Sequence, residues 1–166
     1  VRDARINMIY EGTNTIQSLD LLGRKVLGNQ GATLKKFGEQ ITALVMAEQG
    51  NEEMAEFIKP LTQLGQQMTQ FTGEIGYKAL QNADEVGAAA VDYLRVAGHL
   101  VLGYFWARMA QVALQKIASG DRDPFYQAKV QTARFYFAKL FPETASLMAT
   151  ARAGSAVLME TEAALA

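Results

Sequence analysis

The amino-acid sequence predicts an all-α protein, an up-and-down antiparallel bundle of about four long helices preceded by a shorter helical segment. Apolar residues recur with helical spacing through almost the whole chain, and proline and glycine are sparse enough to mark the ends of helices. There is neither an Asn-Gly hairpin turn nor a sustained alternation of apolar and polar residues. The 166 residues, 49% of them hydrophobic, are enough for one domain with an apolar core.

The composition excludes several classes of function. The net charge of −1 gives no sign of a nucleic-acid or anionic-membrane partner. The chain has no cysteine and one histidine, which excludes disulfides, cysteine chemistry and a histidine-rich metal site, so we expect no metal. The lack of cysteine suits a reducing compartment, and we expect a cytoplasmic location. The chain opens on Val1, with a segment that reads as the tail of an earlier element, so we expect a fragment of a longer protein.

The first helix is expected over residues 15–27. Asn14 is a suitable N-cap, and Gln17 follows three residues later, as in a variant of the capping box. Gly28 is expected to end the helix. One face carries the apolar residues Ile16, Leu19, Leu22 and Val26.

The second and third helices are separated by a short loop. The second is expected over residues 33–49 and ends at Gly50. Asn51 is expected to cap the third, whose apolar positions continue past Gly76. Pro60 lies inside this pattern, so we expect a kink or a short break there.

The fourth helix is expected to open at Asn82 or Asp84 and to reach about Ser119. Its central window, residues 96–114, is apolar enough to resemble a membrane span. His99 and Arg108 lie within that window, and such side chains are costly in lipid. The sequence therefore favours a buried helix of a bundle.

The fifth helix is expected to begin with Asp123 as N-cap and Pro124 as first residue. Pro142 should kink it or divide it in two, and Gly154 should interrupt the part that follows, before an alanine-rich tail. Short connections make neighbouring helices antiparallel, which is how four of them close an up-and-down bundle.

Glu11 is the strongest candidate for chemistry that the residues themselves offer. Ile9 and Tyr10 before it are apolar, and an apolar setting raises a carboxyl pKa towards the range of a general base. Gly12 allows another molecule to approach the backbone, and residues 13–15 add hydroxyl, amide and N–H groups near a helix start. A solvated glutamate beside a turn is the alternative interpretation of the same residues.

The other candidates are better explained by packing. We expect His99 to be packed with a hydrogen bond, and the aromatic runs 104–106 and 135–137 to belong mostly to the core. Gly98 and Gly103 are expected to permit close helix packing. There is no phosphate-binding loop, no dinucleotide fingerprint and no Ser/His/Asp set.

The segment "RDARINM" (residues 2–8) followed by "IYEGTNTIQ" (residues 9–17) resembles the C-terminal signature of acyl-CoA dehydrogenases, the FAD enzymes of fatty-acid β-oxidation. The resemblance implies that residues 1–28 are the final loop and helix of that family's C-terminal domain. Later segments resemble a larger branch of the family with an extra helical domain, which implies an accessory bundle over residues 33–166.

The resemblance also implies roles for individual residues. Glu11 matches the catalytic base, Gly12 matches a residue that lies against the substrate, and Thr13, Asn14 and Thr15 match a run that contacts FAD. It implies an acyl-CoA substrate, electron-transfer flavoprotein or a similar electron acceptor, and a homo-oligomer (dimer or tetramer). The net charge and the polar residues of the apolar window add the expectation of no nucleic acid and no membrane span. It further implies that the fragment alone binds no FAD and is inactive. The competing interpretation is a non-catalytic helical interaction or oligomerisation domain, which would have no reason to carry the pattern of residues 2–17.

Overall fold

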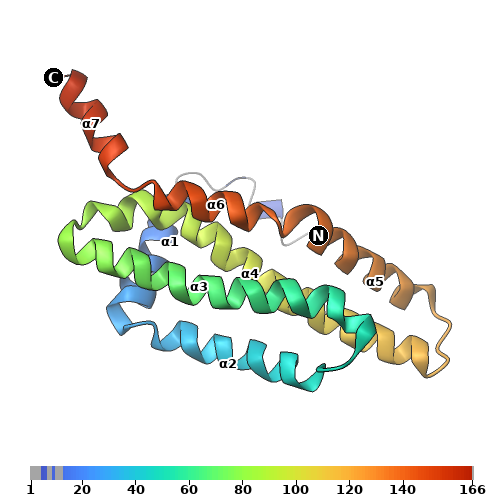
Figure 1. Cartoon of the computed structure of the whole chain (residues 1–166). Helices are drawn as coiled ribbons and strands as arrows, with labels where there is room; N and C mark the ends of the chain where they lie inside the picture. Colours follow the sequence, from blue (N-terminus) through green and yellow to red (C-terminus); the bar gives the residue numbers. More distant parts are fainter. Residues whose placement is uncertain (1–4, 7–8, 10–12, 166) are drawn as a thin grey trace.

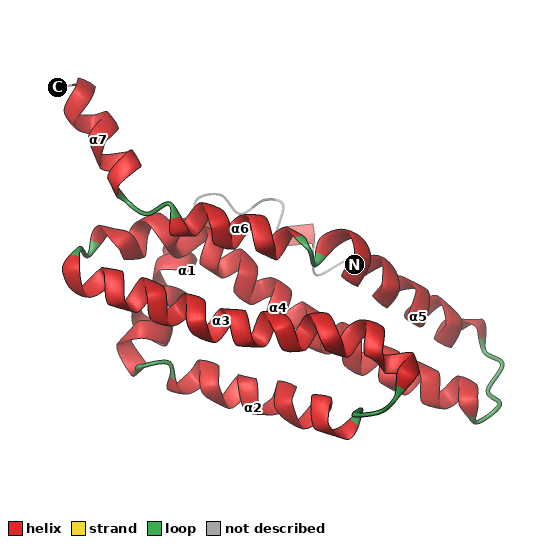
Figure 2. Ribbon diagram, in the orientation of Figure 1, coloured by secondary structure: helices red, strands yellow, loops and turns green. Residues whose placement is uncertain are grey.

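The structure, a computed structural model, describes residues 5, 6, 9 and 13–165 (Figure 1). The predicted all-α class is confirmed, because every regular element within these residues is helical and none is a strand (Figure 2). The predicted site residues Glu11 and Gly12 lie outside the described residues.

The first helical segment differs from the prediction in its bounds and in its geometry. It consists of α1 (Thr13–Leu19), the π-helix η2 (Asp20–Val26) and the 3-10 helix η3 (Leu27–Asn29). Asn14 therefore lies inside the first turn and is not the N-cap, and Gly28 lies within η3. Three successive polar residues, 13–15, offer equally good helix starts, so residue type alone cannot locate the cap.

The next two helices follow the prediction closely. α2 (Ala32–Ala47) leads through a short 3-10 turn (Glu52–Met54) into α3 (Ala55–Gln81). The predicted cap is confirmed, since the Asn51 side chain accepts a hydrogen bond from the Glu53 N–H at 3.1 Å. The break expected at Pro60 is absent, because α3 is continuous through it. The missing N–H removes one helical bond in the second turn, where Phe57 and Leu61 are fully buried and hold the helix in place.

The fourth helix, α4 (Asp84–Ala118), is the central helix of the fold. Of the two predicted starts, Asp84 is the first residue of α4, and the Asn82 side chain accepts a hydrogen bond from the Asp84 N–H at 3.0 Å in the turn before it. Within the described part of the chain α4 alone is long and apolar enough to cross a membrane, a test that the core helix of a globular protein also passes. Here α4 packs against α1, α3 and the α5–α6 segment, and Tyr93 and Val96 are fully buried.

The last part of the bundle is divided as expected. α5 (Pro124–Phe135) begins under the Asp123 cap, whose carboxylate accepts a hydrogen bond from the Phe125 N–H at 2.9 Å. A π-helical stretch (Tyr136–Leu140) follows, and Pro142 separates it from α6 (Glu143–Arg152). Gly154, with a φ of 80°, interrupts the chain before α7 (Ala156–Leu165), which projects away from the bundle (Figure 1).

Four helical units run in alternating directions, with α3 and α4 in the middle, α2 on one side and α5–α6 on the other (Figure 1). Aromatic pairs join them: Phe37 contacts Tyr104 at a ring-centroid distance of 5.5 Å, Phe71 contacts Tyr93 at 5.7 Å, and Phe57 contacts Phe137 at 5.5 Å. Leu22 and Val26 of η2 belong to the same hydrophobic core. The first helical segment is thus anchored on the bundle.

Candidate functional site

Of the predicted site residues, the structure describes Thr13, Asn14 and Thr15. They form the first turn of α1, and all three are exposed. Three residues further on, Ser18 is fully buried, and its hydroxyl donates to the Thr15 carbonyl at 2.7 Å. The turn that matches the flavin-contact run is therefore held at the surface by a buried anchor behind it.

The apolar face expected on the first helix divides into two parts. Leu22 and Val26 are buried in the core, but Ile16 is 68% exposed and Leu19 is 42% exposed. The two exposed residues lie on α1 and the two buried ones on the π-helix η2, which begins at Asp20. Beside the predicted site, α1 thus presents apolar side chains to the outside.

Asp20 is held in an ion-pair cluster at the start of η2. Its carboxylate accepts from the Arg24 guanidinium, and Lys25 Nζ lies 3.0 Å from its other oxygen. These contacts lower the pKa of Asp20 to about 2. The cluster is a surface feature within one helical segment, and it fixes local geometry there.

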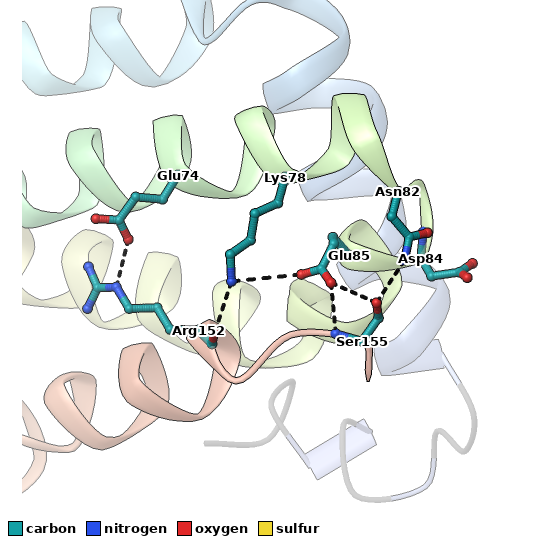
Figure 3. Close-up of polar contacts among 7 residues, drawn as sticks. All are labelled: Glu74, Lys78, Asn82, Asp84, Glu85, Arg152 and Ser155. Atoms are coloured by element: carbon teal, nitrogen blue, oxygen red, sulfur yellow. Dashed lines mark hydrogen bonds and ion pairs between the residues drawn. The ribbon is translucent and has the colours of Figure 1, made fainter. Parts of the chain in front are cut away.

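A second polar cluster joins the loop before α7 to the end of α3 and the start of α4 (Figure 3). Glu85 accepts from the Ser155 N–H at 3.0 Å and from its hydroxyl at 2.7 Å, while Asn82 Nδ2 donates to the same hydroxyl oxygen at 3.0 Å. Lys78 Nζ donates to the Arg152 carbonyl at 3.0 Å. The hydrogen bonds from Ser155 lower the pKa of Glu85. Sequence reasoning missed this cluster, because its partners lie about 70 positions apart.

The single histidine behaves as the sequence predicts. His99 Nδ1 lies 2.9 Å from the Tyr136 hydroxyl, and Nε2 lies 3.1 Å from Glu143 Oε2, with Arg95 on the other oxygen of that carboxylate. Burial raises the pKa of Tyr136 to about 12. The prediction for the aromatic runs is correct for Tyr104, Tyr136 and Phe137, but Phe105 and Phe135 are more than half exposed.

The two glycines expected to permit close helix packing differ in the space around them. A Cβ at Gly103 would lie 2.5 Å from the Phe141 ring, so Gly103 does permit close packing. A Cβ at Gly98 would meet nothing within 4 Å, so the expectation for Gly98 is wrong.

Two grooves lie between the helices. The larger, about 790 Å³, separates α2 from α3 and is lined mostly by small or polar residues, and Lys35 and Glu39 are the ionisable residues among those that line it. The smaller, about 290 Å³, lies between α4 and α5 and is lined mainly by apolar and aromatic side chains. Neither is lined by a residue of the predicted site.

The described residues do not by themselves form a flavin site. Thr13, Asn14 and Thr15 carry polar groups that could touch a flavin, but they lie on one exposed turn and line neither groove. Throughout the described residues every buried side-chain nitrogen or oxygen has a hydrogen-bond partner, so none is left pointing at a missing ligand. The arrangement provides at most one wall of a flavin pocket.

Fold and site together define a class of protein, a helical bundle that carries an exposed polar turn at its N-terminal edge and no complete catalytic set among its described residues. Comparison with known proteins identifies the family of this bundle. The family described as "acetyl-CoA dehydrogenase C-terminal like" matches residues 32–162, and the chain belongs to that family.

Several curated relatives are acyl-CoA dehydrogenases. The chain is 32% identical over 151 residues to the broad-specificity linear acyl-CoA dehydrogenase FadE5 of Mycobacterium tuberculosis, covering 86% of this chain and 25% of that protein. It is 33% identical over 143 residues to 3-methylmercaptopropionyl-CoA dehydrogenase of Ruegeria pomeroyi, with coverages of 86% and 24%. It is 28% identical over 145 residues to a butyryl-CoA dehydrogenase of Syntrophomonas wolfei, with coverages of 85% and 24%. The chain thus spans about a quarter of the length of these relatives.

Proposed function

We propose that this chain is the C-terminal part of an FAD-dependent acyl-CoA dehydrogenase, and that it contributes the catalytic base to a pocket whose other walls lie elsewhere in the longer polypeptide. The supporting observation is that two independent features occur in one chain. The pattern of residues 2–17 lies shortly before residues 32–162, which match a dehydrogenase C-terminal family. A helical interaction or oligomerisation domain without catalytic ancestry is the alternative, and it does not account for the pattern of residues 2–17.

In this proposal the Glu11 carboxylate removes a proton from the α-carbon of an acyl-CoA thioester. The β-hydrogen leaves with its electron pair as hydride, so the substrate is oxidised to an α,β-unsaturated thioester. FAD supplies the hydride acceptor when it is bound in the full enzyme. The Glu11 N–H donates to the thioester carbonyl oxygen, which acidifies the α-carbon, and Gly12 leaves room for the substrate.

The decisive test is Glu11→Gln in the full-length enzyme. Flavin should stay bound, as measured by its visible absorbance, while the bleaching of that absorbance by acyl-CoA is lost. Glu52→Gln, a change at an exposed carboxylate before α3, is the matched control and should bleach normally. Turnover retained by Glu11→Gln would show that the base lies elsewhere.

The isolated 166-residue chain is a second test. Because its described residues form no flavin pocket, titration with FAD should give no saturable binding and acyl-CoA should give no turnover. Saturable binding of FAD by this chain alone would contradict the proposal that the remaining walls lie in another part of the polypeptide.

The bundle is proposed to be an accessory interaction domain of that enzyme, which we propose to be a homo-oligomer that passes electrons to electron-transfer flavoprotein or a similar acceptor. Deleting residues 33–166 from the full enzyme should change its subunit mass in solution or its affinity for acyl-CoA. If neither changes, the bundle has no such role. A cytoplasmic location completes the proposal, and recovery of the full-length protein from the membrane fraction of cells would contradict it.

A further inference from the structure

The smaller groove, between α4 and α5, combines aromatic walls with two positive charges. Phe105 of α4 and Phe125 of α5 line it, and both rings are more than half exposed. Arg108 of α4 and Lys129 of α5 line it as well. The groove lies at the end of the bundle opposite to α1 (Figure 1). It therefore offers aromatic rings beside cations, with one of each on either helix.

Aromatic residues hold both cations in place. Lys129 is half-buried, and its Nζ lies 5.1 Å from the centroid of the Phe125 ring and 5.8 Å from that of the Trp106 ring. The Arg108 guanidinium donates to the Tyr104 hydroxyl at 3.0 Å and lies 5.9 Å from the centroid of the same ring. A cation–π contact positions a cation but does not neutralise its charge.

No carboxylate offsets these two charges. Among the residues that the structure describes, neither Arg108 nor Lys129 forms an ion pair, and no acidic side chain lines the groove. The nearby acidic residues Asp121 and Asp123 accept hydrogen bonds from backbone N–H groups at the start of α5 instead. The groove is thus an apolar hollow with two uncompensated positive charges, which suits a ligand that carries negative charge.

The size of the groove favours a two-ring body for that ligand. A cavity of about 150 Å³ is enough for benzene. A groove of about 290 Å³ therefore has room for a fused pair of rings. Stacking of a nucleobase on an aromatic side chain stabilises binding by about 1–3 kcal/mol. A phosphate monoester carries about −1.5 to −2 charges at pH 7, which matches the two cations.

We propose that this groove binds a purine nucleotide, with the base against Phe105 and Phe125 and the phosphate monoester at Arg108 and Lys129. The nucleotide is either a free mononucleotide or the nucleotide part of a larger molecule such as CoA, and only the second source connects the groove with the proposed function. The test uses neither FAD nor turnover. Its failure therefore leaves the dehydrogenase assignment to be judged separately.

The first test titrates the 166-residue chain with AMP by isothermal calorimetry. AMP should bind saturably. Ribose 5-phosphate, which lacks the base, and adenosine, which lacks the phosphate, should each bind about tenfold more weakly or worse. The absence of saturable AMP binding overturns the proposal, and so does equal binding of AMP and ribose 5-phosphate.

The second test removes the charges one at a time. Arg108→Gln and Lys129→Gln should each weaken AMP binding about tenfold or more, the loss expected for one hydrogen bond to a charged group. Lys36→Gln, at an exposed lysine of α2 outside the groove, is the matched control and should bind AMP like the unmodified chain. Circular dichroism checks the helical content of each variant. If the two groove variants bind AMP as well as the control does, the proposal is wrong.

The third test identifies the source of the nucleotide. Binding of CoA that is tighter than that of AMP, and is weakened in Lys129→Gln, identifies the nucleotide of CoA, whereas binding no tighter than that of AMP identifies a free mononucleotide. Phenyl phosphate carries one ring in place of two. Tighter binding of phenyl phosphate than of AMP would favour a phosphotyrosine side chain of a protein partner and would overturn the proposed nucleotide.

Discussion

At the scale of single residues, Gly103 controls how closely α4 approaches the segment between α5 and α6. A Cβ there would lie 2.5 Å from the buried Phe141 ring, which itself packs on Phe137 at 4.9 Å between centroids. We predict that Gly103→Ala lowers the free energy of unfolding by about 1–3 kcal/mol through overpacking, measured by urea denaturation. Gly73→Ala is the control, because a Cβ there meets nothing within 4 Å and alanine favours the helix by roughly 0.5–1 kcal/mol. Equal effects of the two changes would contradict this account.

The Glu85 carboxylate makes stability depend on pH. Folding lowers its pKa below the ordinary value of 4.5, because Ser155 donates two hydrogen bonds to the ionised form. That stabilisation is present above about pH 4.5 and is lost as the pH falls through the lower folded pKa. We therefore predict that Glu85→Gln lowers the free energy of unfolding at pH 7 by roughly 1 kcal/mol, seen as a lower melting temperature. At pH 3 the same change should lower the melting temperature much less.

The control for this prediction is Glu39→Gln, at an exposed carboxylate on α2 that forms no ion pair with any described residue. Its melting temperature should follow that of the unmodified chain at both pH values. A Glu85→Gln deficit of the same size at pH 3 as at pH 7 would show that packing, and not the ionised carboxylate, holds the loop before α7.

Single residues also show where sequence reasoning about the site succeeds and where it ends. The composition around Glu11 makes it an ordinary candidate, and its proposed role depends on the longer pattern of residues 2–17. Glu85 and Ser155 could not be paired in advance, because their contact exists only once α4 and the loop before α7 are packed together. Local chemistry thus identifies candidate groups, while the tertiary fold decides which of them meet.

At the scale of secondary-structure elements, the helix starts depend on side-chain caps. Asp123 accepts the Phe125 N–H at 2.9 Å and directly precedes Pro124. We predict that Asp123→Ala lowers the free energy of unfolding by about 1 kcal/mol, whereas Asp123→Asn, which keeps the acceptor, has little effect. Urea denaturation of the two variants measures the difference. If both variants lose the same stability, the acidic charge and not the cap is responsible.

The caps at Asn51 and Asp123 could be predicted because a cap acts within two or three residues of its own position. The π-helical stretches could not, since they depend on how Leu22 and Tyr136 are drawn into the core by residues far away. At Pro60 the tertiary packing overrides a local prediction. A local rule predicts a break, but buried neighbours on both sides keep α3 continuous.

At the scale of the whole molecule, the antiparallel order of the helices follows from short loops, and the all-α class follows from apolar periodicity. Neither determines which face of α4 is left open. That face is apolar like the buried faces of the same helix, and only the packing of α3 and α5–α6 shows that it is uncovered. An apolar helix in a bundle therefore identifies a core element without distinguishing the core from an interface.

The same packing predicts that the bundle is not equally stable throughout. α4 is buried between α3 and α5–α6. α2 lies at one side, its buried residues are Ile41 and Leu44, and the groove of about 790 Å³ separates it from α3. We predict that amide hydrogens of α2 exchange faster than those of the middle of α4, because local opening of α2 exposes less apolar surface. Ile41→Ala should accelerate exchange in α2 while exchange in α4 changes little. Hydrogen–deuterium exchange by mass spectrometry measures both, and equal acceleration in α2 and α4 would mean that the bundle opens as one unit.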